Sequence, residues 1–202
     1  MTGRDGLERR RLLGLLGASA TAAVAGCLVD YSEGEDGSED DGDDQAQVYE
    51  PTHEDVEAGP IEFVDTQGCA VCSMTPTNYP RRQSQLVHEN GQAAVFDSPG
   101  CLFAYIASST PDSPIADAWT TDFGTRELID ATEAHFVLIT DEDAADDPMG
   151  IDPRPFADRE DAMAFLDEWE AEELTEDDVM VGIDDVDLET ASIYRGKRLP
   201  DE

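Results

Sequence analysis

The stretch QLVHENGQAAVF, residues 85–96, places two short apolar runs on either side of Glu89-Asn90-Gly91. An Asn-Gly pair supplies the positive φ angles of a tight turn, so this stretch predicts a β-hairpin. Asp97 or Ser98 follows directly and is typical of a helix cap, with Pro99 in the first helical turn. We therefore expect a hairpin that leads straight into a helix.

A second segment of the chain has the same pattern. Residues 96–106, FDSPGCLFAYI, align without gaps on residues 156–166, FADREDAMAFL. Each segment has the pattern of a strand end, a cap and an amphipathic helix, so we infer two similar β-β-α-β units. The prediction is an α+β fold in one domain over residues 60–200. The other elements expected are strands at residues 119–123 and 135–139 and a helix at residues 158–171.

The segment Gly68-Cys69-Ala70-Val71-Cys72-Ser73-Met74 brings two thiols and a thioether together within six residues. Thiolate and thioether sulfurs are soft donors that favour Cu(I) over magnesium, calcium or manganese. In an extended segment, Cys72 and Met74 would point to the same face. Because Cu(I) is satisfied by about two or three sulfur ligands, we predict a copper site here that takes a further ligand from elsewhere.

Met149 is the best candidate for that further ligand. It lies between Pro148 and Gly150 in an acidic loop, a poor position for a core residue. The alternative is a half-buried turn methionine that packs on a neighbouring strand. Met163 falls on the apolar side of the second predicted helix and Met180 in a predicted strand, so both are assigned to the core.

Cys101 lies in the first turn of the first predicted helix, where the helix dipole lowers the pKa of a thiol. It is an additional candidate ligand or a resolving thiol, although a helical Cys beside Leu102 and Phe103 is more often simply buried. The three histidines receive no role: His88 and His135 fall in predicted strands and His53 in a predicted linker.

Two other functions compete with copper binding. A zinc site needs four N or S donors, commonly from two paired knuckles, and the chain has one Cys-x-x-Cys pair. A thiol-disulfide protein needs its Cys-x-x-Cys at a helix N-terminus, and here Pro76 and Pro80 interrupt the segment that follows. A structural or adhesive domain without metal is a third alternative. The sequence contains no nucleophile elbow, phosphate loop or metalloprotease helix, so we do not expect an enzyme.

The N-terminus has the pattern of an export signal. A basic stretch ends at Arg11, and the apolar run 12–25 is too short to span a bilayer. The arginine pair before it is typical of a twin-arginine signal. Val24-Ala25-Gly26-Cys27 resembles a lipobox. We predict a signal peptide over residues 1–26, a lipid on Cys27, and a protein anchored on the outer face of the cytoplasmic membrane.

The chain is strongly acidic, with a formal net charge of −36. Removing residues 1–26 leaves 12 − 4 = 8 basic and 48 − 2 = 46 acidic residues, a net −38. Such a charge repels phosphates and argues against a nucleic-acid partner. The acids are spread along the whole chain, as in proteins that work in molar salt, which indicates a halophilic source. Residues 27–59 are predicted to be an acidic, disordered linker.

Several motifs resemble the NosL family, in the same order along roughly residues 60–170. They are CAVCSM at 69–74, QLV at 85–87, FDS at 96–98, CLFAY at 101–105, WTTDF at 119–123, IDA at 129–131, AHFV at 134–137, PMG at 148–150 and AMAF at 162–165. The resemblance departs from the family pattern at Ser73, where glycine is common, and after Leu174, where no motif corresponds.

The resemblance implies a copper-binding lipoprotein that delivers Cu(I) to nitrous oxide reductase or its assembly machinery. It implies two β-β-α-β units, similar to the core of organomercurial lyase. It assigns Cys72, Met74 and Met149 as copper ligands, with Cys69 at the position of the earlier cysteine of the family motif. A membrane-tethered thiol-disulfide protein that uses Cys69 and Cys72 is the alternative function.

Overall fold

The computed structural model describes residues 49–57 and 59–199. The predicted signal peptide, the predicted lipidation site Cys27 and most of the predicted linker lie outside the described residues. Among the helices within the described ranges, none has the length and apolar character that crossing a membrane requires.

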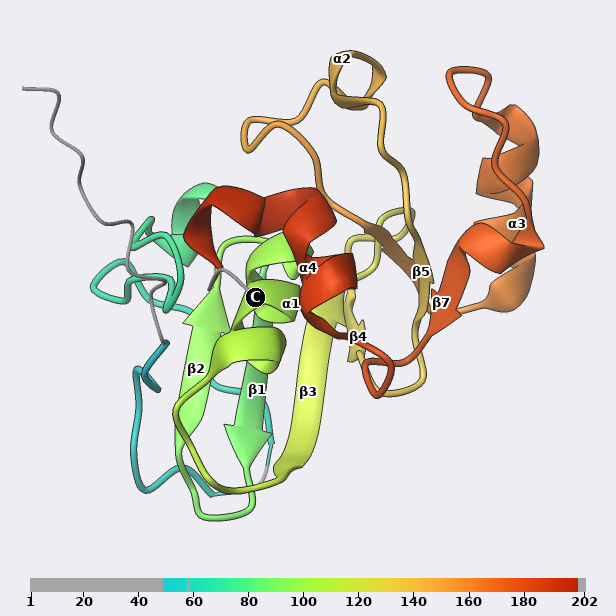
Figure 1. Cartoon of the computed structure of the whole chain (residues 1–202). Helices are drawn as coiled ribbons and strands as arrows, with labels where there is room; N and C mark the ends of the chain where they lie inside the picture. The colour runs from blue at the N-terminus through green and yellow to red at the C-terminus, as the bar shows by residue number, and fades with distance from the viewer. Residues whose placement is uncertain (1–48, 58, 200–202) are drawn as a thin grey trace, which may run out of the picture. The chain divides into compact units, whose positions relative to one another are not determined.

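The first sheet contains the predicted hairpin. Strands β1 (Ser84–His88) and β2 (Ala93–Phe96) pair antiparallel, and Gly91 in their turn has a φ of +82°. Strand β3 (Ile115–Thr121) pairs with the other edge of β1, and β4 (Leu128–Asp130) follows, which gives the order β2-β1-β3-β4 (Figure 1). The hairpin prediction is confirmed.

Helix α1 (Pro99–Ser108) begins directly after β2. Ser98 is its N-cap, and the Ser98 hydroxyl accepts a hydrogen bond from the Cys101 N–H at 3.3 Å. Pro99 occupies the first turn, where its missing N–H costs nothing. Of the two capping candidates, Ser98 is therefore the cap, and the Asp97 side chain is free for another use.

The second sheet repeats the first with fewer residues. Strands β5 (His135–Val137), β6 (Arg154–Phe156) and β7 (Val179–Val181) have the order β6-β5-β7, and α3 (Arg159–Glu168) follows β6. The first unit has the matching order β2-β1-β3, with α1 after β2. The two predicted β-β-α-β units are therefore confirmed, and β4 is an addition to the first sheet.

The two units share one core through the aromatic ring of Phe103 on α1. Its centroid lies 5.1 Å from that of Phe136 on β5 and 6.1 Å from that of Tyr194, both in edge-to-face geometry. Such pairs contribute beyond their buried area. Phe103 therefore joins the first unit both to the second sheet and to the C-terminal helix.

The residues after Leu174 complete the domain. They supply β7 and helix α4 (Leu188–Arg195), which packs beside α1 on the same face of the first sheet (Figure 1). The short helix α2 (Glu142–Ala145) lies in the acidic loop before Met149. The remaining helical turns are η1 (Pro76–Asn78), η2 (Glu176–Asp178) and η3 (Gly196–Arg198), of which the last follows α4 directly.

The predicted boundary between linker and domain is wrong for residues 49–57. Tyr49 is buried in the core, 3% exposed, and forms a bridge with Ser109. The N–H groups of Thr52 and His53 both donate to the carbonyl of Ala93, on β2. These main-chain bonds attach the segment to the sheet, and no local pattern in the acidic sequence signals them.

Three predicted element bounds also differ from those observed. Strand β3 begins four residues earlier than predicted, because Ile115 pairs with His88, and it ends at Thr121. Strand β5 ends at Val137 rather than at residue 139. Helix α3 begins at Arg159 and ends at Glu168, within the predicted range of residues 158–171.

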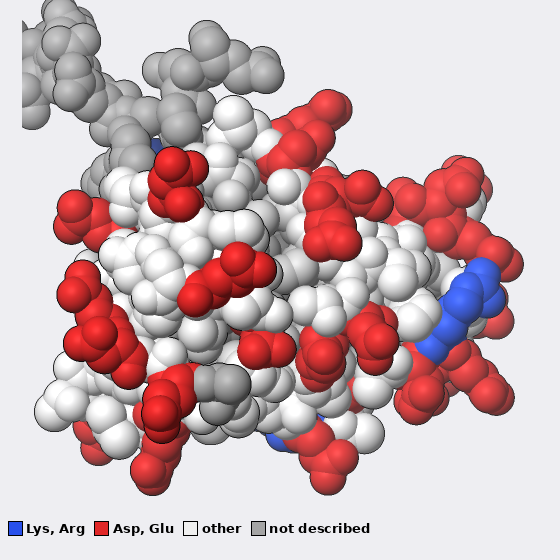
Figure 2. Space-filling view, turned by 90° about the horizontal axis from the view of Figure 1, so that it is seen from below, with Lys and Arg blue, Asp and Glu red and all other residues white. Residues whose placement is uncertain are grey.

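Acidic side chains are dispersed over one face of the domain. Figure 2 shows one face on which they are scattered among uncharged residues, with few basic side chains. This dispersal agrees with the sequence pattern and identifies no acidic binding patch on this face.

Candidate metal centre

The Cys69–Met74 segment forms a tight turn. The Ser73 N–H donates to the Cys69 carbonyl at 2.9 Å, and the Cys69 N–H donates to the Met74 carbonyl at 2.8 Å. Ser73 has a φ of +62°, a conformation that glycine adopts at lower cost. The segment is therefore a turn and not an extended stretch, and the left-handed residue explains why glycine suits this position.

The turn is attached to the first sheet by the Ala70 N–H, which donates to the carbonyl of Val95 at 3.1 Å. This attachment places Cys69 in the core, while Met74 is 40% exposed. Cys72 lies between these extremes and is half-buried. The turn therefore directs its first thiol inward and its thioether toward the surface.

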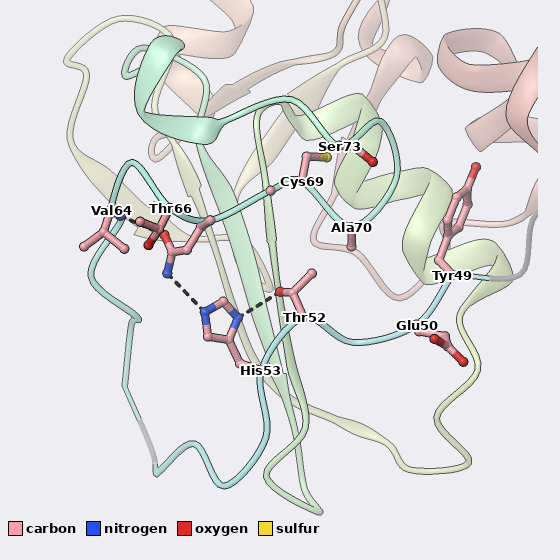
Figure 3. A pocket seen from close by; sticks show the side chains of 11 residues that line it. Tyr49, Glu50, Thr52, His53, Val64, Thr66, Cys69, Ala70 and Ser73 are labelled. Atoms are coloured by element: carbon pink, nitrogen blue, oxygen red, sulfur yellow. Dashed lines mark hydrogen bonds between the residues drawn. The ribbon is translucent and has the colours of Figure 1, made fainter.

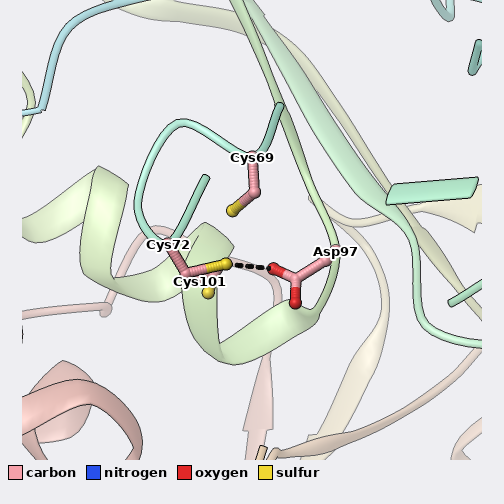
Figure 4. Close-up of side chains that lie close together, drawn as sticks. All are labelled: Cys69, Cys72, Asp97 and Cys101. Carbon is pink, nitrogen blue, oxygen red and sulfur yellow. Dashed lines mark hydrogen bonds between the residues drawn. The ribbon is translucent and has the colours of Figure 1, made fainter. Parts of the chain in front are cut away.

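Three thiols and one carboxylate form the candidate metal centre. The Sγ atoms of Cys69, Cys72 and Cys101 and one carboxylate oxygen of Asp97 all lie within 4.8 Å of one another (Figure 4). Cys101 comes from the first turn of α1, and Asp97 from the junction between β2 and α1. All three thiols are free. The expected burial of Cys101 is confirmed, and the same burial places its sulfur beside the other two.

The ionisable groups of this cluster influence one another through hydrogen bonds and burial. Cys72 Sγ and Asp97 Oδ1 are hydrogen bonded at 3.1 Å. Hydrogen bonds from the thiols of Cys101 and Cys69 lower the pKa of Cys72 to about 4. Burial raises the pKa of the Cys69 thiol, and burial also raises that of the Asp97 carboxyl. Within this cluster, the half-buried Cys72 thus has a lowered thiol pKa, whereas the buried Cys69 has a raised one.

A second observation, besides its proximity to the thiols, indicates that Asp97 could bind a ligand. Its Oδ2 atom is buried and has no hydrogen-bond partner within the described part of the chain. Leaving such an oxygen unpaired is costly, so a bound cation or a retained proton would stabilise it. The set of three sulfurs and one oxygen suits Cu(I). A tetrahedral Zn²⁺ ion would use the same four donors.

Arg195 on α4 joins this cluster to a buried ionic network. Its Nε donates to Cys101 Sγ at 3.3 Å, and its Nη2 donates to Asp152 at 2.7 Å. Asp152 also accepts from the Gly100 N–H at 2.9 Å and from Arg82 at 3.0 Å. Sequence reasoning missed Asp97, Asp152 and Arg195 as site residues. Asp97 alone carried a local signal, as one of two adjacent capping candidates.

The two predicted methionine ligands lie together in a separate place. Met74 and Met149 both line a surface pocket of about 620 Å³, and none of the three cysteines lines it. Arg195 also lines this pocket while donating to Cys101, so the pocket and the thiol cluster are neighbours. That Cys69, Cys72, Met74 and Met149 bind one ion stays a prediction.

The loop that carries Met149 is held by buried charges. Asp147 accepts a hydrogen bond from the Met149 N–H at 2.9 Å and pairs with Arg154 at 3.1 Å and with Arg82. These contacts hold the backbone of the loop in place. The side chain of Met149 itself lines the pocket.

A second hollow, of about 840 Å³, is lined in part by Cys69 and Ser73 (Figure 3). His53 lies at its wall, with its ring nitrogens 2.8 Å from Thr52 Oγ1 and 3.1 Å from Gln67 Nε2. His53 therefore belongs to the folded domain and not to a linker. Both of its ring nitrogens have partners, and it is not a candidate ligand.

The lowered pKa of Cys72 predicts a distinctive alkylation profile for the metal-free protein. Because Cys72 is a thiolate above about pH 4, its alkylation rate should be nearly constant between pH 6 and 8. The alkylation rate of an ordinary thiol, with a pKa of about 8.5, rises almost tenfold per pH unit in this range. Mass spectrometry after timed iodoacetamide treatment measures the rate, and denatured protein is the control. A tenfold rise per unit in the folded protein would refute the prediction.

The protein is an α+β domain of two β-β-α-β units. Its buried cluster of soft sulfur donors makes it a candidate binder of a soft metal ion. A sequence model of the NosL family, described as NosL, matches residues 60–181, more than half of the 202-residue chain. The chain therefore belongs to the NosL family, as its motifs predicted.

Among solved structures, the chain is similar to the crystal structure of the copper chaperone NosL from Shewanella denitrificans. The sequence identity is 20% and the TM-score 0.46, over 59% of this chain and 97% of that one. No curated protein matches the chain. Helix α4 and the segment before residue 60 lie outside the family match.

Proposed function

We propose that the protein is a metallochaperone that binds Cu(I) through Cys69, Cys72 and Cys101 and delivers it for assembly of the copper centres of nitrous oxide reductase. One observation carries the proposal: in a NosL family member, three free thiols lie within 4.8 Å of one another. Delivery makes and breaks metal–ligand bonds only, so the protein is not an enzyme in this proposal.

Low coordination suits delivery better than storage. Two or three sulfur ligands hold Cu(I) and leave room for an incoming donor, so copper passes between proteins by ligand exchange. Cys72 is the half-buried member of the cluster and is the sulfur that an acceptor reaches first. Met74 and Met149 line the neighbouring pocket and supply thioethers on the outward path.

The receiving protein and the membrane tether complete the proposal. NosL membership supports nitrous oxide reductase, or its assembly machinery, as the partner, and the structurally similar Shewanella denitrificans protein is named a copper chaperone. Export and a lipid on Cys27 would place the domain on the outer face of the cytoplasmic membrane, where that partner would receive copper.

The test is copper transfer at molar salt from the full chain to copper-free nitrous oxide reductase. The Cu(I)-loaded wild type should restore the absorption of the copper centres faster than the same amount of copper held by a small chelator. Cys72→Ser, loaded in the same way, should give no advantage over the chelator. Equal rates for wild type and chelator would contradict delivery, even if copper binding is tight.

A thiol-disulfide function is the second candidate, because the cluster combines an acidic thiol with two neighbouring thiols. Met74→Leu separates the two functions. It should slow copper transfer, because Met74 lies on the proposed outward path, and leave the oxidation of the thiols unchanged. Wild type that binds no copper but cycles a disulfide readily would favour the redox function.

A further inference from the structure

We propose that Arg195 is a positioning residue of the copper centre, which it serves by fixing the thiol of Cys101 and by offsetting the charge of the copper–thiolate complex. The proposal rests on the proposed function. It concerns a residue beyond the family match, which ends at residue 181.

The guanidinium of Arg195 is held in one orientation. Its Nη1 donates to the carbonyl oxygens of Ile151, at 3.0 Å, and Tyr194, at 2.6 Å. Its Nη2 donates to Ser98 Oγ at 2.8 Å and to Asp152 at 2.7 Å. Its Nε is then directed at Cys101 Sγ, 3.3 Å away. Because every nitrogen of the planar guanidinium has a partner, the Nε–H is held in one direction toward the sulfur. The flexible ammonium of a lysine could not be held in this way.

The ion-paired groups around Arg195 carry one more positive than negative charge among themselves. Arg82, Arg154 and Arg195 carry three positive charges, whereas Asp147 and Asp152, which pair with them, carry two negative charges. Arg195 connects this network to the thiol cluster, because its Nε contacts the sulfur of Cys101. Cu(I) bound to two or more thiolates is an anion, and a fixed buried cation stabilises it.

The C-terminal segment also holds the turn that carries the other two thiols. Arg198 Nη1 donates to the Val71 carbonyl at 3.4 Å, and the Tyr49 hydroxyl donates to the Arg198 carbonyl. Helix α4 and η3 therefore contact both parts of the centre, the Cys101 helix and the Cys69–Cys72 turn. A partner that holds a metal ligand in place typically contributes roughly 10- to 100-fold to metal affinity.

Arg195→Lys tests the proposal, because lysine keeps the charge beside Asp152 and loses the donor to Cys101. In a chelator competition with the full chain, we expect a Cu(I) affinity about tenfold lower than that of the wild type. In a Cys101→Ser background the same substitution should change affinity less than about twofold, since its target is gone. Arg159→Lys alters an exposed ion pair with Glu176 and should leave affinity unchanged.

The outcomes separate the two proposals. If the wild type binds no Cu(I), the proposed function is overturned. If the wild type binds Cu(I) tightly and the Arg195→Lys variant has the same affinity, the role of Arg195 is overturned. If Arg195→Lys lowers the Cu(I) affinity equally in the wild-type and the Cys101→Ser backgrounds, Arg195 acts on folding alone. That result also overturns the role of Arg195. Should Arg195→Lys not fold, NMR of the wild type decides. The Arg195 Nε–H resonance should shift on Cu(I) loading, and an unmoved resonance refutes the contact.

Discussion

Replacing Cys72 with serine should lower the Cu(I) affinity of the protein by at least about a hundredfold, more than the loss of a supporting group typically costs. Cys72 is the anionic member of the thiol cluster and its accessible one. Serine has nearly the same size but offers a hard, protonated oxygen that Cu(I) binds poorly. Competition against a Cu(I) chelator at molar salt measures the change.

Cys101→Ser is the informative companion of this variant, because Cys101 lies 29 positions further along the chain and joins the cluster through the fold. The Cys101→Ser variant should also bind Cu(I) less tightly. Arg195 keeps its hydrogen bonds to Ser98 and Asp152 in this variant, so we expect the fold to be retained. Circular dichroism and thermal unfolding of the metal-free variants control for folding. If both serine variants keep wild-type affinity while Met74→Leu and Met149→Leu abolish binding, the ion lies in the methionine pocket and the thiol centre is refuted.

Asp152→Asn should destabilise the fold by about 3 kcal/mol or more, the typical cost of removing one partner from a buried ion pair. The Asp152 side chain is fully buried between Arg82 and Arg195 and also accepts the Gly100 N–H. Asparagine preserves the shape and leaves the buried guanidinium of Arg195 without its ion-pair partner, while Arg82 keeps Asp147. A loss of this size is a large part of the roughly 5–15 kcal/mol that stabilises a typical domain.

Urea unfolding of the metal-free protein measures this effect, and Asp167→Asn is the matched control. Asp167 lies exposed on α3, and its substitution should change the free energy of unfolding by less than about 0.5 kcal/mol. The Asp152 effect should persist at high salt, because salt screens buried pairs much less than exposed ones. A loss below about 1 kcal/mol would show that the network contributes little to folding.

Local signals in the sequence were enough to predict the repeated unit. The Asn90-Gly91 pair specifies the hairpin, and Ser98-Pro99 specifies the start of α1. The gapless alignment of residues 96–106 with residues 156–166 places Phe96 and Phe156 at the last positions of β2 and β6. Each of these features depends on residues that are neighbours in the chain. A local pattern of a few residues is therefore enough to predict it.

The metal centre could be predicted only in part, because it is assembled from distant segments. The Cys-x-x-Cys spacing indicated Cys69 and Cys72, but Arg195 reaches Cys101 across 94 positions. No periodicity connects a C-terminal helix to a thiol at such a distance. Asp97 is not predicted as a site residue for a different reason: beside Ser98 it has the pattern of a helix cap, and the structure assigns the cap to Ser98 alone.

The turn geometry also lay beyond sequence reasoning. Ser73 occupies a left-handed conformation that serine rarely adopts, and this residue folds the segment back on itself. An extended segment would have directed Cys72 and Met74 to the same face. The turn buries Cys69 instead and exposes Met74, and this separates the thiols from the methionine pocket.

Copper X-ray absorption of the Cu(I)-loaded full chain tests the thiol centre most directly. The account predicts that two or three sulfur atoms surround the copper, with no more than one oxygen, and that Cys101→Ser changes this sulfur shell while Met149→Leu does not. A copper ion surrounded mainly by nitrogen or oxygen, or a sulfur shell that responds to Met149→Leu and not to Cys101→Ser, would contradict it.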